Sequence, residues 1–576
     1  MAEERSYWER FWQRRLSRRR VLKGAALAGA GLSAAAIIGC GGEEEKPAAT
    51  ATPAAATPAA ATPAAAAPKQ GGTLVAHDGG EPVFDNYLAW SYRSCMYNSM
   101  CYPRLLKFKV YPGAPVLEYD VEPDLARSMP EQPDDTTYTF KLLPAKWEDK
   151  AGTNGRELTS EDVKVAFERH SEIHPNRTLF TGEVASVTAP DKETVTFKLN
   201  KPLGPFLRHI GHQGMFYILN RELVDAEETK TDMVSAGPFI LEKYDVGVGV
   251  SLKRNPDYYR APLPNIDRLE VRIIPDSSTW LSALRSKALD SLLWVGMSQL
   301  DKASLERDLP NATFTSFPFA ANMWLGVDGK NPIFKDPRVR QAVSMTLDRD
   351  ALLAVAGGEG DWLTQITSLP KWWLNPKDKA KFGANAKYYH HDLAAAKQLL
   401  SAAGHPDGIK GLPLDVAIAW YPTRKSENEL VHAQLKEGGI DTDLKVMEFG
   451  AFYAKHITKA DWEGLAYAGN LIGSDPNDWF SILWNPDSPR VIVEELLDGD
   501  TDLQNRLEQQ RRELNEERRV EIVHDIQRYL AEKMYNVPAP IPYLYHVQQD
   551  YVKDMHYIWT YGPGPEYLDT LWLDKA

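Results

Sequence analysis

Cysteine and long apolar runs are both scarce in this chain. Three cysteines occur among 576 residues, and neither a CxxC motif nor another paired-cysteine metal spacing is present, which argues against a thiolate metal centre. Cys95 and Cys101 could form a disulfide, or they could remain two buried thiols. After Cys40 the sequence has no further apolar run of the roughly 20 residues that a membrane-spanning helix needs, so no later spanning segment is expected.

The signatures of common catalytic sites are also missing. The sequence contains no GxSxG nucleophile elbow, no P-loop and no protein-kinase motif set. Histidines occur in pairs that lack a carboxylate motif such as HExxH, and we interpret them as surface or helix-end residues: His170 and His174, His209 and His212, and His390 and His391. The sequence predicts a protein that is not an enzyme and needs no metal or cofactor. An exported hydrolase is the rival class.

Acidic residues outnumber basic ones. The chain has 66 Lys and Arg against 79 Asp and Glu, a formal net charge of −13. Residues 1–39 hold eight basic and three acidic residues, so the chain without them carries a net charge near −18. A negative balance of this size argues against nucleic acid as a partner, because the phosphate backbone is itself negative.

The N-terminus has the layout of an export signal. Arg18, Arg19 and Arg20 precede an apolar run over residues 24–38, which ends at Gly39 and Cys40. The paired arginines match a twin-arginine export address. The small residue before Cys40 resembles a bacterial lipobox, in which the cysteine is acylated and becomes the mature N-terminus. An uncleaved single-span anchor is the alternative. Either way, the rest of the chain is predicted to work outside the cytoplasmic membrane, tethered to it.

Residues 41–70 are predicted to form a disordered tether. Thr-Pro pairs at 52–53, 57–58 and 62–63 interrupt blocks of alanine, and nothing in the segment is apolar enough to form a core. About 30 semi-extended residues at roughly 3.1 Å each would reach on the order of 90 Å from the membrane.

Strand and helix patterns are mixed along the rest of the chain. Short apolar or alternating segments predict strands over residues 73–76, 137–142, 195–199, 269–274 and 324–327. Helices are predicted to begin after the capping residues Thr159, Asp336 and Asp392, and a long amphipathic helix is predicted over residues 518–534. The mixture predicts an α/β or α+β protein with more than one lobe.

Four blocks of sequence lie in order between residues 71 and 560. They are residues 125–128 with 137–142 and 158–163, residues 237–239 with 252–259, residues 336–342 with 348–349, and residues 392–408. Together these blocks resemble the family 5 extracellular solute-binding proteins, the peptide and nickel binders of ABC importers.

The resemblance implies a two-lobed, periplasmic-binding-protein-like α/β fold with an extra inserted domain. A hinge would join the lobes, with the ligand cleft between them. Lobe I is then expected to comprise residues 71–110, 235–325 and 545–576, the inserted subdomain residues 111–234, and lobe II residues 326–544. The implied role is that of a monomer that captures an oligopeptide or dipeptide and delivers it to an ABC transporter permease. An oligosaccharide ligand and a ligand-loaded sensor are the alternatives.

The resemblance also points to a ligand site near Asp475. In the peptide-binding members, an aspartate just before such an Asp-Pro turn pairs with the α-ammonium of the ligand. Here the preceding positions are Asn470, Leu471 and Ile472, so the expected acid is missing. An unpaired buried ammonium costs several kcal/mol, so either Asp475 or Asp478 substitutes, or the ligand has no free amino terminus. Asp475 could instead cap the following helix.

Arg424 and three tryptophans complete the candidate ligand-binding residues, together with Asn470, Asp475 and Asp478. Arg424 lies near the position where some dipeptide binders hold the ligand carboxylate, a role that suits its guanidinium; an exposed loop arginine is the alternative. The chain has 16 tryptophans. Most are expected in the core, but Trp90, Trp420 and Trp479 fall in segments that could face the cleft and stack on a sugar or an apolar side chain.

Overall fold

The computed structural model describes most of the chain after residue 66. The described residues are 67–85, 87, 91–150, 152–225, 232–293, 296–319, 321–417, 424–457, 461–471, 473–488, 490–560, 562–563 and 568–575. The predicted signal, Cys40, most of the predicted tether, Trp90 and Trp420 lie outside them. Residues Ala67–Ala576 form one compact unit.

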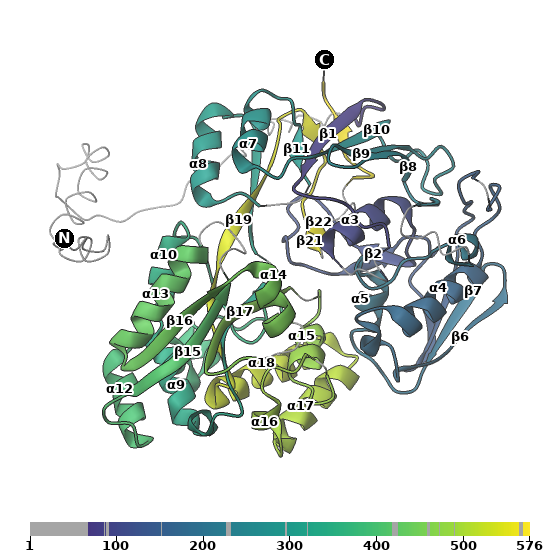
Figure 1. The fold of residues 1–576 in the computed structure, drawn as a ribbon. Helices are drawn as coiled ribbons and strands as arrows, with labels where there is room; N and C mark the ends of the chain where they lie inside the picture. The colour runs from purple at the N-terminus through teal and green to yellow at the C-terminus, as the bar shows by residue number, and fades with distance from the viewer. Residues whose placement is uncertain are drawn as a thin grey trace, which may run out of the picture. The chain divides into compact units, whose positions relative to one another are not determined.

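The largest sheet joins segments from both ends of this unit (Figure 1). Its strands follow the order β12 (Thr313–Pro318), β19 (Pro540–Gln548), β11 (Ser291–Leu292), β1 (Thr73–Asp78), β10 (Arg268–Ile273), β9 (Gly249–Arg254) and β8 (Phe239–Asp245), and β14 (Gly360–Trp362) also pairs with β19. β1 runs parallel to β10, with Leu74 opposite Leu269. The helices of this part are α3 (Tyr92–Cys101), α7 (Ser277–Arg285) and α8 (Gln299–Asp308), of which α8 contacts β19.

The second sheet contains a seven-residue strand that is buried along its whole length. Its order is β16 (Ile440–Met447), β15 (Ile409–Ala417), β17 (Leu465–Leu471), β13 (Ala321–Val327) and β18 (Asn536–Pro538). β15 is parallel to β16 and β17, whereas β13 is antiparallel to β17 and β18, and every residue of β13 is buried. Helix α13 (Arg424–Glu437) contacts β16, and α9 (Pro337–Thr346) contacts α12 (Leu393–Ala402) and α18 (Glu516–Lys533).

The other helices around the second sheet are short, apart from α17. They are η2 (Pro332–Lys335), α10 (Arg349–Val355), α11 (Lys379–Phe382), η3 (Ala384–Tyr389), α14 (Phe449–Phe452), η4 (Tyr453–Ile457), α15 (Pro476–Leu483), α16 (Glu494–Leu497) and α17 (Thr501–Arg512). We call residues 319–538 the second-sheet region.

The third sheet is antiparallel throughout. Its order is β4 (Glu131–Asp134), β5 (Thr137–Lys141), β7 (Thr194–Leu199) and β6 (Val184–Asp191), and α4 (Ser160–Ile173) packs on β6 and β7. Nearby elements are β2 (Leu106–Phe108), β3 (Val121–Pro123), η1 (Arg177–Leu179), α5 (Phe206–Gly211) and α6 (Arg221–Asp225). Two small pairs, β20 (Val552–Lys553) with β23 (Trp572–Leu573) and β21 (Trp559–Thr560) with β22 (Gly562–Pro563), lie near the C-terminus of the chain. We call residues 104–225 the third-sheet region.

The predicted α/β fold class is confirmed, and so are the elements with strong local signals. Predicted segments 137–142, 195–199, 269–274 and 324–327 fall on β5, β7, β10 and β13. Thr159 and Asp162 form a capping box at the start of α4, while Asp336 and Asp392 cap α9 and α12 through their side chains. The predicted lobe boundaries stay predictions; those at 325/326 and 544/545 fall inside β13 and β19.

Cys95 and Cys101 are both on α3 and both are buried and free. Of the two possibilities left open by the sequence, the two buried thiols are therefore the one found.

Candidate functional site

The start of α15 carries two of the predicted ligand-binding residues. The Asp475 side chain accepts a hydrogen bond from the backbone N–H of Asn477 (2.9 Å), and Asp478 accepts from the backbone N–H groups of Ser474 (2.9 Å) and Asp475 (3.1 Å). The two carboxylates form a capping box, with Pro476 in the first turn. The expectation that Asp475 caps this helix is confirmed, and both side chains are fully buried.

The Asp475 carboxylate also receives two guanidinium groups. Arg519, on α18, donates to it at 2.8 and 2.5 Å, and Arg208, on α5, donates at 3.4 Å. Burial by itself would raise the pKa of Asp475, but the charges of Arg519 and Arg208 hold this pKa below its ordinary value. Asp475 is therefore ionised at neutral pH, and its charge is compensated from both regions.

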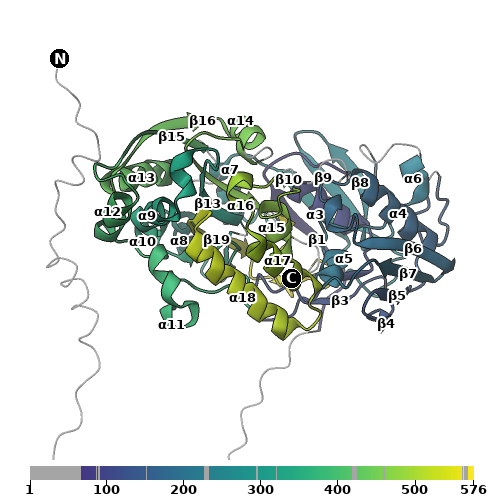
Figure 2. The same ribbon diagram turned by 90° about the horizontal axis from the view of Figure 1, so that it is seen from below.

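Asp478 has a partner in the third-sheet region as well. Its Oδ1 lies 2.6 Å from Nε2 of His209, at the end of α5, and both side chains are fully buried. The first turn of α15 therefore meets α5 at two points, and Figure 2 shows these two helices side by side.

His209 belongs to a group of four buried histidines. His170 and His174 are stacked with ring centroids 4.3 Å apart, and Phe180 lies against both His170 and His209. His170 and His174 lie at the end of α4, and His209 and the fourth histidine, His212, lie at the end of α5, so the helix-end interpretation is confirmed for these two pairs. For these four residues the surface interpretation is wrong, because aromatic side chains cover the rings and leave each at most 1% exposed. In the third pair, His390 is half-buried and His391 is exposed.

Further ion pairs join the third-sheet and second-sheet regions, and the shortest of them are Glu183 with Arg512 (2.5 Å), Arg208 with Glu516 (2.5 Å) and Asp120 with Lys371 (3.0 Å). The indole of Trp372 lies among them. The guanidinium carbons of Arg208 and Arg519 are 5.1 and 5.0 Å from the centre of its ring, within the range of a cation–π contact.

A backbone contact lies beside these pairs. The N–H of Gly204 donates to the carbonyl of Arg511, at the end of α17, over 2.8 Å. A Cβ atom on Gly204 would lie 2.5 Å from the carbonyl oxygen of Glu513. Glycine is therefore required here because the two backbones approach so closely.

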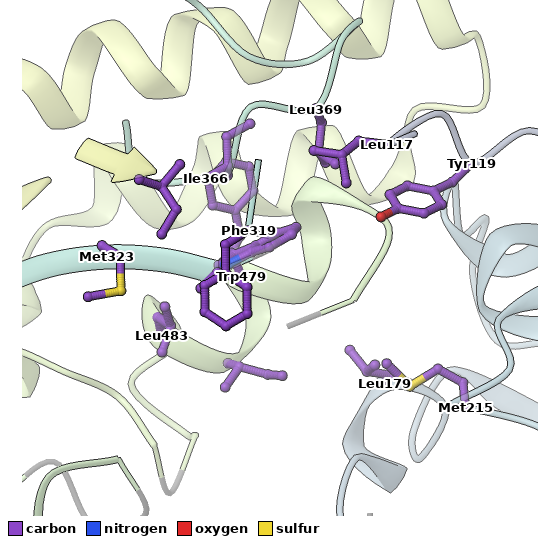
Figure 3. Close-up of a cluster of buried hydrophobic side chains, with 14 of the residues drawn as sticks. Leu117, Tyr119, Leu179, Met215, Phe319, Met323, Ile366, Leu369, Trp479 and Leu483 are labelled. Atoms are coloured by element: carbon purple, nitrogen blue, oxygen red, sulfur yellow. The ribbon is translucent and has the colours of Figure 1, made fainter. Parts of the chain in front are cut away.

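Apolar side chains from the two regions also face each other. Figure 3 shows the two sets: Leu117, Tyr119, Leu179 and Met215 on one side, and Phe319, Met323, Trp479 and Leu483 on the other. All of them belong to one buried cluster. Such an arrangement places apolar surface from two regions where a solute could be enclosed.

The remaining predicted site residues are placed as follows. Trp479 is fully buried, and its indole N–H has no hydrogen-bond partner among the described residues. Arg424, on α13, is fully buried; its guanidinium carbon lies 3.7 Å from the centre of the Tyr467 ring and it donates to the Tyr467 carbonyl. An exposed loop arginine is therefore the wrong alternative. Asn470 lies on β17, where it is opposite Asn322 of β13, five residues before the capping turn.

Sequence reasoning missed the partners of Asp475. Arg208 is 267 positions away in the chain, and no local pattern marks a pairing at that distance. Arg519 did leave a signal, because it lies four residues before Val523 and seven before Ile526, on the buried face of α18. A charged residue at a core position of a helix needs a buried partner.

The described residues offer neither a membrane-spanning helix nor a metal site. None of the helices found there has both the length and the apolar composition to cross a membrane. In the same part of the chain, no group of three or more histidine, cysteine or acidic side chains is arranged to hold a metal ion.

Comparison with known proteins gives consistent matches. The sequence profile of the bacterial extracellular solute-binding proteins, family 5 middle region, matches residues 120–489. A Brucella ovis protein named for peptide binding by an ABC transporter is 28% identical over 368 residues, which cover 62% of this chain and 66% of that protein. The oligopeptide-binding protein AppA of Bacillus subtilis is 26% identical over 417 residues, covering 69% and 72%.

A similar fold is found among solved structures. The periplasmic binding protein DppA of Helicobacter pylori, in complex with the peptide STSA, superposes with a TM-score of 0.70 at 23% identity, covering 88% of this chain and 99% of that one. At this level of identity the match concerns the fold alone.

Proposed function

The chain belongs to the bacterial extracellular solute-binding proteins of family 5, and on this premise we propose that it captures a peptide-like solute outside the cytoplasmic membrane and delivers it to the permease of an ABC importer. The names of the Brucella ovis and Bacillus subtilis relatives, which refer to peptide binding, support this ligand class. The role is one of binding and release, in which no bond of the solute is made or broken.

The observation that carries the proposal is the pair of facing surfaces between the third-sheet and second-sheet regions. Buried apolar side chains from both regions form one cluster, and ion pairs connect the same two regions. Two regions that meet through such surfaces can separate to admit a solute and then close to bury it.

Native mass spectrometry of the purified full chain, followed by incubation with peptide and glycan pools, tests the proposal. We expect a mixture of short peptides to co-purify and to be retained without change. Turnover of either pool would favour the hydrolase class instead, and a single retained saccharide mass would favour the oligosaccharide alternative.

Free and N-acetylated peptides are expected to bind about equally well. Asp475 and Asp478 already hold Arg519, Arg208 and His209, so a ligand ammonium would have to displace one of these partners. We therefore expect dissociation constants that differ by less than about tenfold, or about 1.4 kcal/mol. The measurement is retention of a tri- to pentapeptide pool and of its N-acetylated copy. A loss of about 2–5 kcal/mol on acetylation would instead indicate an ammonium paired with a buried carboxylate.

Cys40 is proposed to be the site of lipid attachment. Metabolic labelling with a fatty acid should tag the wild-type chain, while Cys40→Ala should lose the label because no acylated sulfur remains, and should shed protein from the membrane or keep an uncleaved signal. Cys95→Ala is the matched control, since that thiol is buried on α3, and it should keep the label. Equal labelling of Cys40→Ala would exclude the lipobox and favour the spanning anchor.

A further inference from the structure

The three shortest of the further ion pairs between the third-sheet and second-sheet regions form a complementary pattern. Along the third-sheet side the charges are negative at Glu183, negative at Asp120 and positive at Arg208; along the second-sheet side they are positive at Arg512, positive at Lys371 and negative at Glu516. Each charge meets its opposite. We call these six residues the latch.

Two of the three pairs are joined into one network. Glu516 lies 2.5 Å from Arg208 and 3.2 Å from Lys371, and Arg208 also lies 3.8 Å from Asp120, so separating the two regions breaks a shared set of attractions. Electrostatic complementarity of this kind selects one relative position of two surfaces more strongly than it adds to their affinity.

The latch side chains pair with each other and are partly exposed to solvent. The Glu183 and Arg512 side chains are 12% and 21% exposed, and Asp120 and Lys371 are 47% and 37% exposed. The pairs therefore lie at the rim of the interface, where salt reaches them, whereas the apolar cluster shown in Figure 3 lies in the buried part.

From this geometry we propose that the latch is a salt-sensitive device that holds the third-sheet and second-sheet regions together without help from the ligand. It rests on the proposed function only in that this closing encloses a solute. The latch keeps a fraction of the ligand-free molecules closed. Weakening it should therefore shift the ligand-free population toward the open form.

Closure has a direct reporter in the backbone. The Gly204 amide donates to the Arg511 carbonyl across the interface, so it is protected from hydrogen exchange only while the regions are together. Exchange at this amide can be measured on the full chain without any ligand. Failure of the latch would thus be seen separately from failure of the proposed function.

The test variant is Glu183→Gln combined with Lys371→Gln, which removes one charge from each side. We expect the Gly204 amide to exchange about tenfold faster than in the wild type, because each partly exposed pair contributes modestly and two are lost. Amides of β5 and β7, within the third-sheet region, should not change. Arg285→Gln is the matched control: it breaks a 2.6 Å pair with Asp308 between α7 and α8 and should leave Gly204 protected.

Salt provides a second measurement that needs no variant. The screening length falls from about 10 Å at 0.1 M salt to about 3 Å at 1 M, so wild-type Gly204 should exchange faster at 1 M. A further variant, Gly204→Ala, forces the interface apart sterically and sets the scale for the open form. If Gly204→Ala speeds exchange at this position while neither the charge variant nor salt does, apolar packing alone holds the regions together and the latch is refuted.

Discussion

Asp475→Asn is expected to lower the free energy of unfolding by about 3–5 kcal/mol, the usual cost of removing one partner from a buried ion pair. Asparagine caps a helix as well as aspartate does, so the start of α15 should survive the change. What is lost is the negative charge that faces Arg519 at 2.5 Å, with both side chains at most 2% exposed. Urea denaturation followed by tryptophan fluorescence measures the difference.

Two comparisons show whether charge is the cause. Asp276→Asn changes an N-cap that is exposed and bonded to the backbone and hydroxyl of Thr279 rather than to an arginine, and it should cost less than about 1 kcal/mol. Asp475→Asn combined with Arg519→Met removes both charges and should be less damaging than Asp475→Asn alone. A single-variant loss below about 1 kcal/mol would show that the pair does not carry this stability.

Mild acid is expected to destabilise the fold steeply, from about pH 6.5 downward. Burial lowers the pKa of His174 and His212 to about 3, that of His77 and His546 to about 4, and that of His170 well below its ordinary value of 6.5. As pH falls below 6.5 the unfolded chain binds protons that the folded chain does not, so stability is full above this pH and declines below it. Each histidine contributes up to about 1.4 kcal/mol per pH unit.

Urea denaturation at pH values between 7 and 5 tests this slope. His170→Phe removes one such group from a site where neither ring nitrogen has a hydrogen-bond partner among the described residues. Its slope should be shallower than that of the wild type by up to about 1.4 kcal/mol per pH unit. His405→Gln, at a half-exposed position after α12, is the control and should keep the wild-type slope. A pH-independent stability over this range would contradict the assignment of the histidines as buried and neutral.

Local signals account for the parts of the fold that the sequence predicted. A capping box such as Thr159 with Asp162, or the alternation over residues 137–142, acts within a few residues and survives in any tertiary context. Local signals do not predict the order of strands in a sheet, because β13 pairs with β17 about 140 residues later and with β18 about 210 residues later. Those pairings depend on packing across the whole region.

Within the candidate site, the sequence predicted the helix cap at Asp475 but not the residues that contact it from other elements. The Asp-Pro turn indicated a cap at Asp475, and this is what Asp475 does. The sequence could not show that the same carboxylate meets Arg208, because such a contact requires α5 and α15 to be side by side. For the same reason the sequence left open that Arg424 is an exposed loop residue: its burial against Tyr467 follows from the packing of α13 on the second sheet.

The capping box at α15 has a consequence for the speed of closing. If the two regions separate, Asp475 loses Arg208 and Asp478 loses His209, yet the backbone amides of Ser474, Asp475 and Asn477 remain bound to the same carboxylates. The helix end is thus already built before the partner arrives. Closing then requires no helix nucleation, whose cost would slow it, and it can proceed as a collision between preformed surfaces on the timescale of rigid-body domain motion.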